Sequence, residues 1–394
     1  MPSPTRPLSV LFAGGGTTGH ISPMLAIADD LRFQDPEARV TVLGTPEGLE
    51  TRLVPAAGYE LTTIDKVPMP RSLDLGVLRF PGKLLGTISR VRRLLKEREV
   101  DVVVGVGGYV STPAYLAARL SGVPVVVHEA NARPGMANKL AAKFTPAENI
   151  GYCFAGTPLP GHRVGMPMRA GIEHLDRRDP SVRAAAAGRL GLAPDMPALV
   201  VTGGSLGAQS INDAMLHAMD AVAAAGIQVL HITGRGKGED LAAAAADHPH
   251  YHVVDYVDGM ENAYLAADLL VCRAGAGTVA EVSVMQVPAV YVPLPIGNGE
   301  QRLNASEAVK AGAAHMVVDA DFTADRVISG IVPLLTEPDR LARLEQAARE
   351  LDFPAAAART MVRVLYRAAE RDHPARPYPD HLLTASELRT RKDR

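Results

Sequence analysis

One unit recurs in both halves of the chain and limits the possible folds: a short apolar run, a glycine-rich turn and a helical pattern. It reads LSVLFAGGGTTGH at 8–20 and ALVVTGGSLGAQS at 198–210. Two further pairs of stretches correspond in the same order: 101–116 with 268–282, and 123–131 with 287–295. Continuous apolar runs alternating with helical patterns are typical of βαβ units with buried parallel strands. The order predicts an α/β chain of two doubly wound domains.

The domain boundaries follow from changes in composition along the 394 residues. We place an N-terminal domain at 1–165 and a C-terminal domain at 166–353, because strand-like sequence gives way there to Pro, Gly and charge. The helical pattern at 354–371 is expected to return to the first domain. Residues 372–394 are polar and contain prolines, which predicts a flexible tail.

Charge and cysteine content argue against several classes of protein. The formal net charge of −2 does not favour nucleic-acid binding. Cys153 and Cys272 lie far apart and no Cys/His metal spacing occurs, which fits a reducing compartment. There is no secretory signal and no uncharged apolar run of about 20 residues, so we expect a soluble or peripheral protein.

The first glycine-rich turn approaches two nucleotide-binding patterns and completes neither. Gly14, Gly16 and Gly19 satisfy G-x-G-x-x-G, but the next predicted strand ends in Gly44 and Thr45 instead of the acid that a dinucleotide requires. The residue after the last of these glycines is a histidine, where a phosphate-binding P-loop has lysine. The turn is therefore either a tight connection only or a backbone anion site at a helix N-terminus.

A later turn, RAGAGTVAEV, places two polar residues on one helical face. Thr278 and Glu281 are three residues apart there. The Glu281 carboxylate either caps the helix or accepts hydrogen bonds from sugar hydroxyls.

Eight motifs, in order, resemble the MurG family of glycosyltransferases. They are GGGTTGH, VGVGGYVSTPA, VVHEAN, GMPMR, TGGSLGA, YVDGM, CRAGAGTVAE and GNGEQRLNA. The resemblance implies the GT-B architecture of two Rossmann-like domains facing a cleft. It also implies inverting transfer of N-acetylglucosamine from UDP-N-acetylglucosamine to the 4-hydroxyl of undecaprenyl-diphosphate-linked muramyl-pentapeptide, lipid I to lipid II, in bacterial peptidoglycan synthesis. Three alternatives stay open: another GT-B enzyme on this donor such as an epimerase, an NAD(P)-dependent oxidoreductase, and an idle nucleotide-sugar-binding module.

The same resemblance implies which residues contact the substrates. Donor contacts map to Thr17, Thr18, Gly19, Asn131, Arg169, Ser205, the Val257 backbone, Ala276, Gly277, Thr278, Val279, Ala280, Glu281 and Gln301. Tyr109 and Asn304 are candidate acceptor contacts, and a structural role is the alternative for both. Arg169 alternatively forms an interdomain salt bridge. Thr18, Gly277 and Glu300 depart from residues that are commoner in the family.

The reaction needs a base for the acceptor hydroxyl and a positive environment for the leaving diphosphate. His20 is the leading base, because a helix N-terminus disfavours its protonated form; its alternative role is to hydrogen-bond the loop. Glu129 is the rival base, or it orders its own loop. Helix N-termini would stabilise the diphosphate. No D-x-D motif stands in these turns, so we expect no tightly held metal, and assistance by a divalent cation such as Mg²⁺ stays open.

Basic and apolar residues alternate in the segment 75–98. Such a stretch either lies on an anionic membrane surface or packs on the sheet with its basic face in water. Because the acceptor of the family is lipid-linked, we expect residues 75–90 to attach the protein peripherally to the cytoplasmic face of the cell membrane. Leu94 and Leu95 are expected to face the core.

Overall fold

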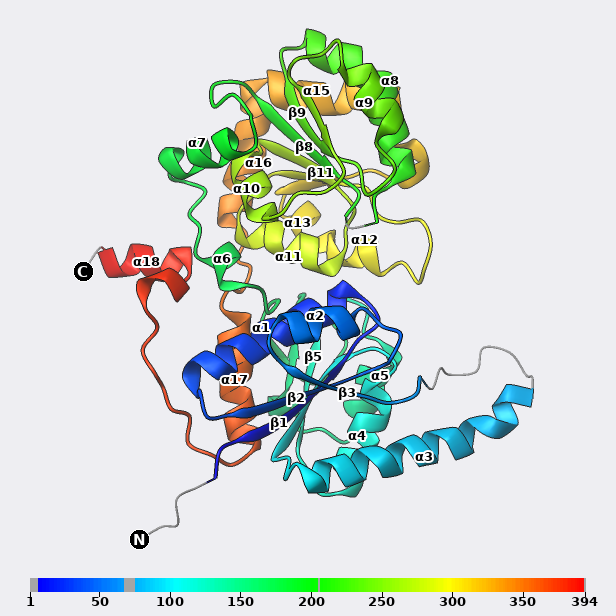
Figure 1. The fold of residues 1–394 in the computed structure, drawn as a ribbon. Helices are drawn as coiled ribbons and strands as arrows, with labels where there is room; N and C mark the ends of the chain where they lie inside the picture. Colours follow the sequence, from blue (N-terminus) through cyan, green and yellow to red (C-terminus); the bar gives the residue numbers. More distant parts are fainter. Residues whose placement is uncertain (1–5, 67–74, 205, 393–394) are drawn as a thin grey trace. The chain divides into compact units, whose positions relative to one another are not determined.

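The computed structural model describes residues 6–66, 75–204 and 206–392. The chain divides into two compact units (Figure 1): Met1–Arg169 with Pro354–Pro379, and Ala170–Phe353 with Asp380–Arg394. Each unit contains a parallel sheet with helices on both faces, so the α/β class and the two-domain plan predicted from the sequence are confirmed.

The first unit has a seven-stranded parallel sheet in the order β3-β2-β1-β4-β5-β6-β7. Its strands are β1 (Ser9–Gly14), β2 (Arg39–Gly44), β3 (Glu60–Thr63), β4 (Val102–Gly107), β5 (Val125–Glu129), β6 (Ile150–Tyr152) and β7 (His162–Arg163). Strands β1, β4 and β5 are buried at every residue, as their continuous apolar sequences predict. The chain order reverses beside β1, and open α/β sheets bind ligands at the carboxyl ends of strands at such a point.

Helices cover both faces of this sheet. They are α1 (Thr18–Gln34), α2 (Glu50–Ala56), α3 (Leu75–Glu97), α4 (Ser111–Leu120), α5 (Met136–Ala141), the 3₁₀ turn η1 (Ala147–Asn149) and α17 (Ala357–Ala368). One core joins β1 and β4 to α1 and α17, and a second joins the other face to α3 and α4. Helix α17 lies in the first unit, where the sequence places it, and buries Met361, Val362 and Leu365 completely.

Helix α3 combines a buried stripe with an exposed basic face. Ile88, Val91 and Leu95 are buried against the sheet, and Leu94 packs against the same core, so the two leucines lie as predicted. Leu85 is 65% exposed, and the nearby cations are exposed too: Lys83, Arg90, Arg92, Arg93. The side chains of 75–80, to which part of the membrane prediction applies, are outside the described residues. No helix within the described ranges is long and apolar enough to cross a bilayer.

The second unit repeats the plan with a six-stranded parallel sheet in the order β10-β9-β8-β11-β12-β13. Its strands are β8 (Ala198–Thr202), β9 (Gln228–Ile232), β10 (Tyr251–Val254), β11 (Leu269–Cys272), β12 (Ala289–Tyr291) and β13 (Ala314–Met316). The chain order reverses beside β8, the counterpart of β1. Both glycine-rich turns that match in sequence therefore follow matching strands.

The helices and helical turns of the second unit complete its layers. They are α6 (Ala170–Glu173), α7 (Pro180–Arg189), α8 (Gln209–Ala224), α9 (Glu239–Ala245), α10 (Met260–Ala266), α11 (Ala276–Val284), α12 (Glu300–Asn304), α13 (Ser306–Lys310), η2 (Asp319–Asp321), α14 (Ala324–Arg326), η3 (Val327–Ile331), α15 (Val332–Thr336), α16 (Pro338–Glu350), η4 (Asp380–Leu382) and α18 (Ala385–Lys392). The buried face of α8 packs on β8 and β9. Each fully buried aliphatic side chain there contributes about 1.5–3 kcal/mol of transfer free energy.

The C-terminal stretch differs from the flexible tail that its composition predicts. The Tyr378 hydroxyl donates to Asp30 Oδ2 at 2.9 Å, and its ring stacks on Phe33 with centroids 5.1 Å apart. The Arg359 guanidinium lies 3.7 Å from the same ring centroid. Further on, α18 begins where Thr384 Oγ1 accepts a hydrogen bond from the Glu387 amide. Proline and polar residues suggested disorder, but aromatic and capping contacts give this stretch a defined path.

Candidate active site

The turn after β1 is held by the carboxylate of Glu50, the first residue of α2. Glu50 Oε2 accepts from the Gly16 amide at 3.0 Å, and Oε1 accepts from the amide and hydroxyl of Thr45, both at 2.8 Å. The side chain is 0% exposed. Burial opposes ionisation, but the bonds from Gly16 and Thr45 outweigh it, and the pKa of the Glu50 carboxyl lies below its ordinary value.

Glycines around this carboxylate make room for it. A Cβ at Gly15, Gly44 or Gly48 would lie 2.6, 2.5 or 2.1 Å from an atom of the Glu50 side chain. Gly16 has a φ of +87°, which a residue with a Cβ rarely adopts. Sequence reasoning missed Glu50, because it sought an acid at the end of β2 that would face a ribose. The glycines at 44 and 48 were the available signal.

His20 lies in the first turn of α1, beside the turn that follows β4. Its Nδ1 is 3.3 Å from Thr17 Oγ1, and its Nε2 would be 3.2 Å from a Cβ at Gly107, whose φ is +98°. Burial lowers the pKa of the His20 imidazole, and the Glu129 carboxylate opposes that shift. At neutral pH the imidazole is therefore mainly uncharged and can accept a proton.

Ser111, the first residue of α4, connects the turns after β1 and β4. Its Oγ lies 2.9 Å from the Ala13 carbonyl oxygen and 2.7 Å from that of Gly107, and its hydroxyl can donate to either. A Cβ at Gly108 would lie only 2.8 Å from the Gly15 carbonyl oxygen. The two turns are thus packed backbone against backbone, which fixes the surroundings of the imidazole.

Glu129, at the end of β5, uses both carboxylate oxygens to order the loop that follows. Oε1 accepts from the Asn131 amide at 2.9 Å, and Oε2 accepts from the Gly135 amide at 3.0 Å and from Asn138 Nδ2 at 2.8 Å. The Asn138 amide oxygen in turn accepts from the Tyr115 hydroxyl at 2.7 Å. Glu129 is 3% exposed. Of the two roles considered for it, this geometry favours loop ordering over general-base catalysis.

The other predicted contacts of the first unit lie at its surface or close to it. Thr17, Thr18 and Gly19 are exposed where α1 begins. Tyr109 is 41% exposed, and the Lys66 ammonium lies 4.9 Å from its ring centroid. The remaining two are half-buried Asn131 and exposed Arg169, the last residue before the second unit. Their substrate roles, and the salt bridge considered for Arg169, stay predictions.

In the second unit, the turn after β8 is compact because its glycines let backbone segments approach one another closely. A Cβ at Gly203 would lie 2.1 Å from the Ala208 amide nitrogen, and one at Gly207 would lie 2.1 Å from the Thr233 carbonyl oxygen. Helix α8 follows Ala208, which has no side-chain oxygen to cap it, so its first amides can serve an anion. Ser205, predicted to bind the donor, lies outside the described residues.

Helix α11 contains several residues that were predicted to contact the donor, among them its first turn and one acidic side chain. Ala276, Gly277 and Thr278 are half buried there. The side chains of Val279 and Ala280 are 1% and 0% exposed, so these two predicted contacts can offer only backbone groups.

The capping interpretation of Glu281 is wrong, because this residue is the sixth of α11 and its Oε2 accepts from the Tyr264 hydroxyl at 2.8 Å. Burial, together with that carboxylate, holds the pKa of Tyr264 well above its ordinary value. The tyrosine therefore stays protonated and acts as a hydrogen-bond donor that fixes the half-buried carboxylate.

Gln301 and Asn304 hold the turns that follow β11 and β12. Gln301 Oε1 accepts from the Ala274 amide at 3.1 Å and from the Leu294 amide at 2.9 Å. Asn304 is 1% exposed and its Nδ2 donates to the Ala274 carbonyl at 3.3 Å. Of the two roles considered for Asn304, this geometry favours the satisfied loop amide, and the acceptor contact stays a prediction. Val257 is also buried, which leaves its backbone as the group that was predicted to bind.

Comparisons with known proteins agree with this arrangement. The N-terminal domain model of glycosyltransferase family 28 matches residues 10–149, and the C-terminal domain model matches 198–360. A solved structure, the crystal structure of Acinetobacter baumannii MurG, aligns with a TM-score of 0.74 at 30% identity and covers 92% of this chain and 100% of that one.

Two curated relatives carry the name UDP-N-acetylglucosamine–N-acetylmuramyl-(pentapeptide) pyrophosphoryl-undecaprenol N-acetylglucosamine transferase. The protein of Paenarthrobacter aurescens (strain TC1) is 54% identical over 351 residues, which are 88% of this chain and 93% of that protein. The protein of Clavibacter sepedonicus is 50% identical over 370 residues, which are 93% and 98% of the two chains. With this identity over almost the whole length of its relatives, and with both domains of glycosyltransferase family 28, the chain belongs to the MurG family of N-acetylglucosamine transferases.

Proposed function

We propose that this chain transfers N-acetylglucosamine from UDP-N-acetylglucosamine to the 4-hydroxyl of undecaprenyl-diphosphate-linked N-acetylmuramyl-pentapeptide, with inversion at the anomeric carbon. Membership of the MurG family supports the substrates. The observation that carries the mechanism is His20, an uncharged imidazole at a helix N-terminus, held between Thr17 and Gly107. The attacking hydroxyl requires such a base near neutral pH.

The proton and electron movements in this reaction balance simply. The acceptor oxygen forms a bond to the anomeric carbon, while the bond from that carbon to the phosphate oxygen breaks and its electrons remain on UDP. In this proposal Nδ1 carries the resting proton of the neutral imidazole and donates it to Thr17 Oγ1, so the hydroxyl proton passes to His20 Nε2. Nearby Glu129 stabilises the imidazolium that results, although it does not take the proton itself.

The second unit supplies the donor site in this proposal. The first amides of α8 and α11 would receive the negative charge that develops on the leaving diphosphate, without reorganisation. Glu281, positioned by Tyr264, would accept hydrogen bonds from sugar or ribose hydroxyls. Gln301 would act by holding the turns around this site, because its amide oxygen already bonds two backbone amides.

A transfer assay with labelled UDP-N-acetylglucosamine tests the function. We expect UDP release to require the lipid-linked muramyl acceptor, and the label to appear in a β-linked disaccharide. Activity should persist in a chelator, because the sequence predicts no tightly held metal. Release of UDP or epimerisation of the sugar without the acceptor would instead support the alternative of a GT-B epimerase.

Replacement of the proposed base gives a sharper prediction. His20→Gln should lower kcat by roughly 10²–10⁴-fold and leave the KM for UDP-N-acetylglucosamine within about twofold. In the unsubstituted enzyme kcat should fall on acidification, with a midpoint below 6.5, because burial lowers the pKa of the imidazole and only its neutral form accepts the proton. The matched control is His217→Gln, which changes an exposed histidine on α8. A kcat for His20→Gln equal to that of this control would remove His20 as the base.

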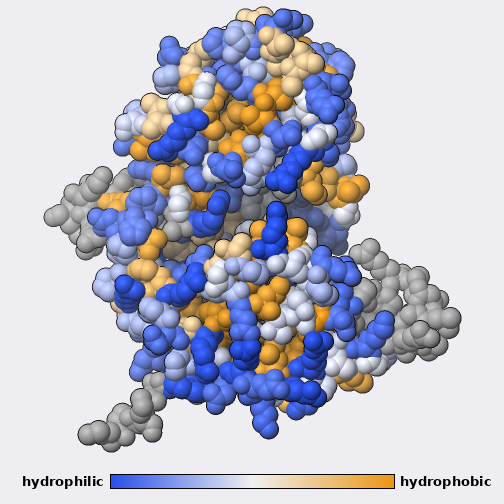
Figure 2. Space-filling view, viewed as in Figure 1, coloured by the Kyte–Doolittle hydropathy of each residue, from blue (hydrophilic) through white to orange (hydrophobic). Residues whose placement is uncertain are grey.

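We further propose that the part of α3 within residues 75–90 attaches the protein peripherally to the cytoplasmic membrane surface. Exposed Leu85 with the cations Lys83 and Arg90 supports this. On the face drawn in Figure 2, hydrophilic and hydrophobic side chains are interspersed over both units. Each cation near an anionic membrane surface adds about 1 kcal/mol, so electrostatic attraction would make a large contribution to attachment by α3.

The membrane proposal predicts that Lys83→Gln/Arg90→Gln weakens binding to vesicles containing anionic lipid roughly thirtyfold, at about 1 kcal/mol for each cation. Co-sedimentation measures this. The control, Lys310→Gln/Arg343→Gln, removes two exposed cations from the second unit and should bind like the parent. Equal binding by the two double variants would contradict the role of α3.

A further inference from the structure

A small cavity in the second unit is lined mainly by arginines. Its volume is about 210 Å³. The lining residues are Arg177, Arg178, Pro180, Arg183, Gln286 and Arg349. None of these described lining residues is acidic, and none is among those expected to contact the donor sugar.

Three chain segments build this cavity. Arg177 and Arg178 lie just before α7, Gln286 follows α11 with a φ of +57°, and Arg349 lies near the end of α16. The chain passes between its two units at 169/170, 353/354 and 379/380. The cavity is therefore formed by the segment that first enters the second unit, by Gln286, and by the helix that precedes the crossing at 353/354.

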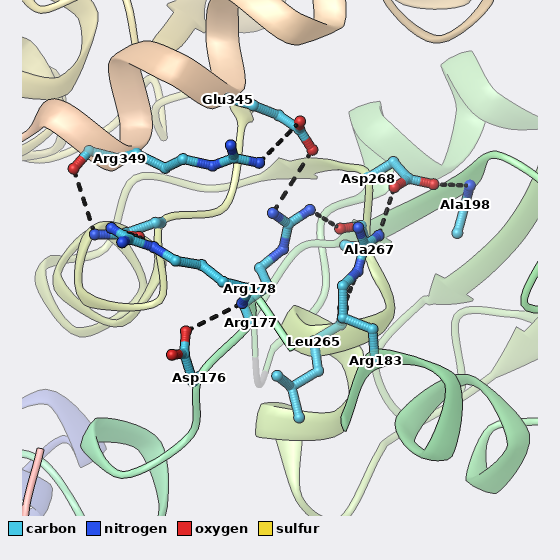
Figure 3. A network of polar contacts seen from close by, with 11 residues as sticks. Asp176, Arg177, Arg178, Arg183, Ala198, Leu265, Ala267, Asp268, Glu345 and Arg349 are labelled. Atoms are coloured by element: carbon cyan, nitrogen blue, oxygen red, sulfur yellow. Dashed lines mark hydrogen bonds and ion pairs between the residues drawn. The ribbon is translucent and has the colours of Figure 1, made fainter. Parts of the chain in front are cut away.

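Arg177 is the buried member of the group, at 8% exposure. Its Nη2 donates to the Ala267 carbonyl at 2.5 Å, and its Nη1 lies 3.8 Å from Glu345 Oε1 (Figure 3). Its Nε is buried and has no hydrogen-bond partner among the described residues. A buried donor left without a partner is costly, so an anion held by other N–H groups of the same guanidinium would offset part of that cost.

The guanidinium groups of the other three arginines have more N–H groups than the hydrogen bonds described below require. Arg178 donates through Nε and Nη2 to Gln286 Oε1, at 3.1 and 3.0 Å. Arg183 donates through Nη2 to Asp268 at 2.5 Å, and Arg349 through Nη2 to Glu345 at 3.3 Å. A guanidinium has five N–H groups, so each of these retains several.

The surroundings of Arg177 disfavour its positive charge, which a bound anion would stabilise. Burial, and next the charge of Arg183, lower the pKa of Arg177 to about 10, although Glu345 and Asp268 oppose the shift. Two further carboxylates nearby, Asp176 and Asp179, accept backbone amides of Arg178 and Ser181.

We propose that this cavity binds a small oxyanion, a single phosphate-sized group, through the guanidinium groups of Arg177, Arg178 and Arg349. Planar guanidinium forks match the geometry of phosphate oxygens. The volume corresponds to roughly seven waters at ~30 Å³ each, and it is below the ~300 Å³ at which pockets for larger organic ligands begin. A nucleotide is therefore too large. The bound anion would link the entering segment to α16.

Titration with inorganic phosphate tests the proposal. Calorimetry is run at constant ionic strength with saturating UDP, so that phosphate does not compete for the proposed donor site. We expect saturable binding that weakens at least tenfold in Arg178→Gln/Arg349→Gln. Both changed side chains are exposed and lie at the rim, so the variant should fold, and an unchanged thermal midpoint without phosphate checks this. The control Arg343→Gln alters an exposed arginine on α16 outside the cavity and should bind phosphate within twofold of the parent.

Two results would overturn the oxyanion site. One is the absence of saturable phosphate binding by the parent protein, and the other is equal phosphate affinity in the double variant and in Arg343→Gln. The comparison between variants assigns the site even if UDP fails to bind, so this test remains separate from the test of transferase activity.

Discussion

The buried carboxylate of Glu50 is the interaction on which the proposed catalytic centre depends. The turn after β1 has left-handed backbone at Gly16, and because glycine adopts many conformations readily, the turn needs other contacts to hold a single geometry. Glu50 fixes it by bonding the Gly16 amide together with the amide and hydroxyl of Thr45, so that α1, α2 and β2 share one anchor. His20 lies in the first turn of α1, directly after that anchored turn. Its imidazole is therefore positioned before any substrate binds, as electrostatic and acid–base catalysis require.

The same device recurs at two other turns. Glu129 accepts hydrogen bonds from the backbone amides of Asn131 and Gly135, and Gln301 accepts them from those of Ala274 and Leu294. In each case a side-chain oxygen satisfies backbone donors that the turn cannot satisfy itself. Glycine-rich turns supply closely approaching backbone, and these acceptors give the turns a single geometry. Residues that resemble catalytic or binding groups in sequence can therefore act indirectly, by fixing the backbone of the turns that form the site.

The sequence predicts the architecture well, because alternating apolar runs and the order of matching stretches depend on local patterning. It predicts the site less completely. Glu50 was missed because its partners are backbone amides brought together only by the fold. The alternatives for Glu281 and Asn304 stay open in the sequence for a related reason, since spacing cannot tell that Tyr264 faces the carboxylate or that the amide is buried. The order of the C-terminal stretch likewise depends on Tyr378 meeting Asp30 and Phe33.

Substitution of Glu50 tests the central claim most directly. The control is Glu47→Gln, because Glu47 is exposed in the turn between β2 and α2 that immediately precedes Glu50. Glu50→Ala should lower the free energy of unfolding by about 3 kcal/mol and kcat at least tenfold, with the donor KM little changed. Because folding lowers the pKa of Glu50, its stabilisation should be present above its ordinary value of 4.5 and lost as the pH falls through the lower folded-state value. If Glu50→Ala matched Glu47→Gln in both stability and kcat, the turn would not depend on this carboxylate.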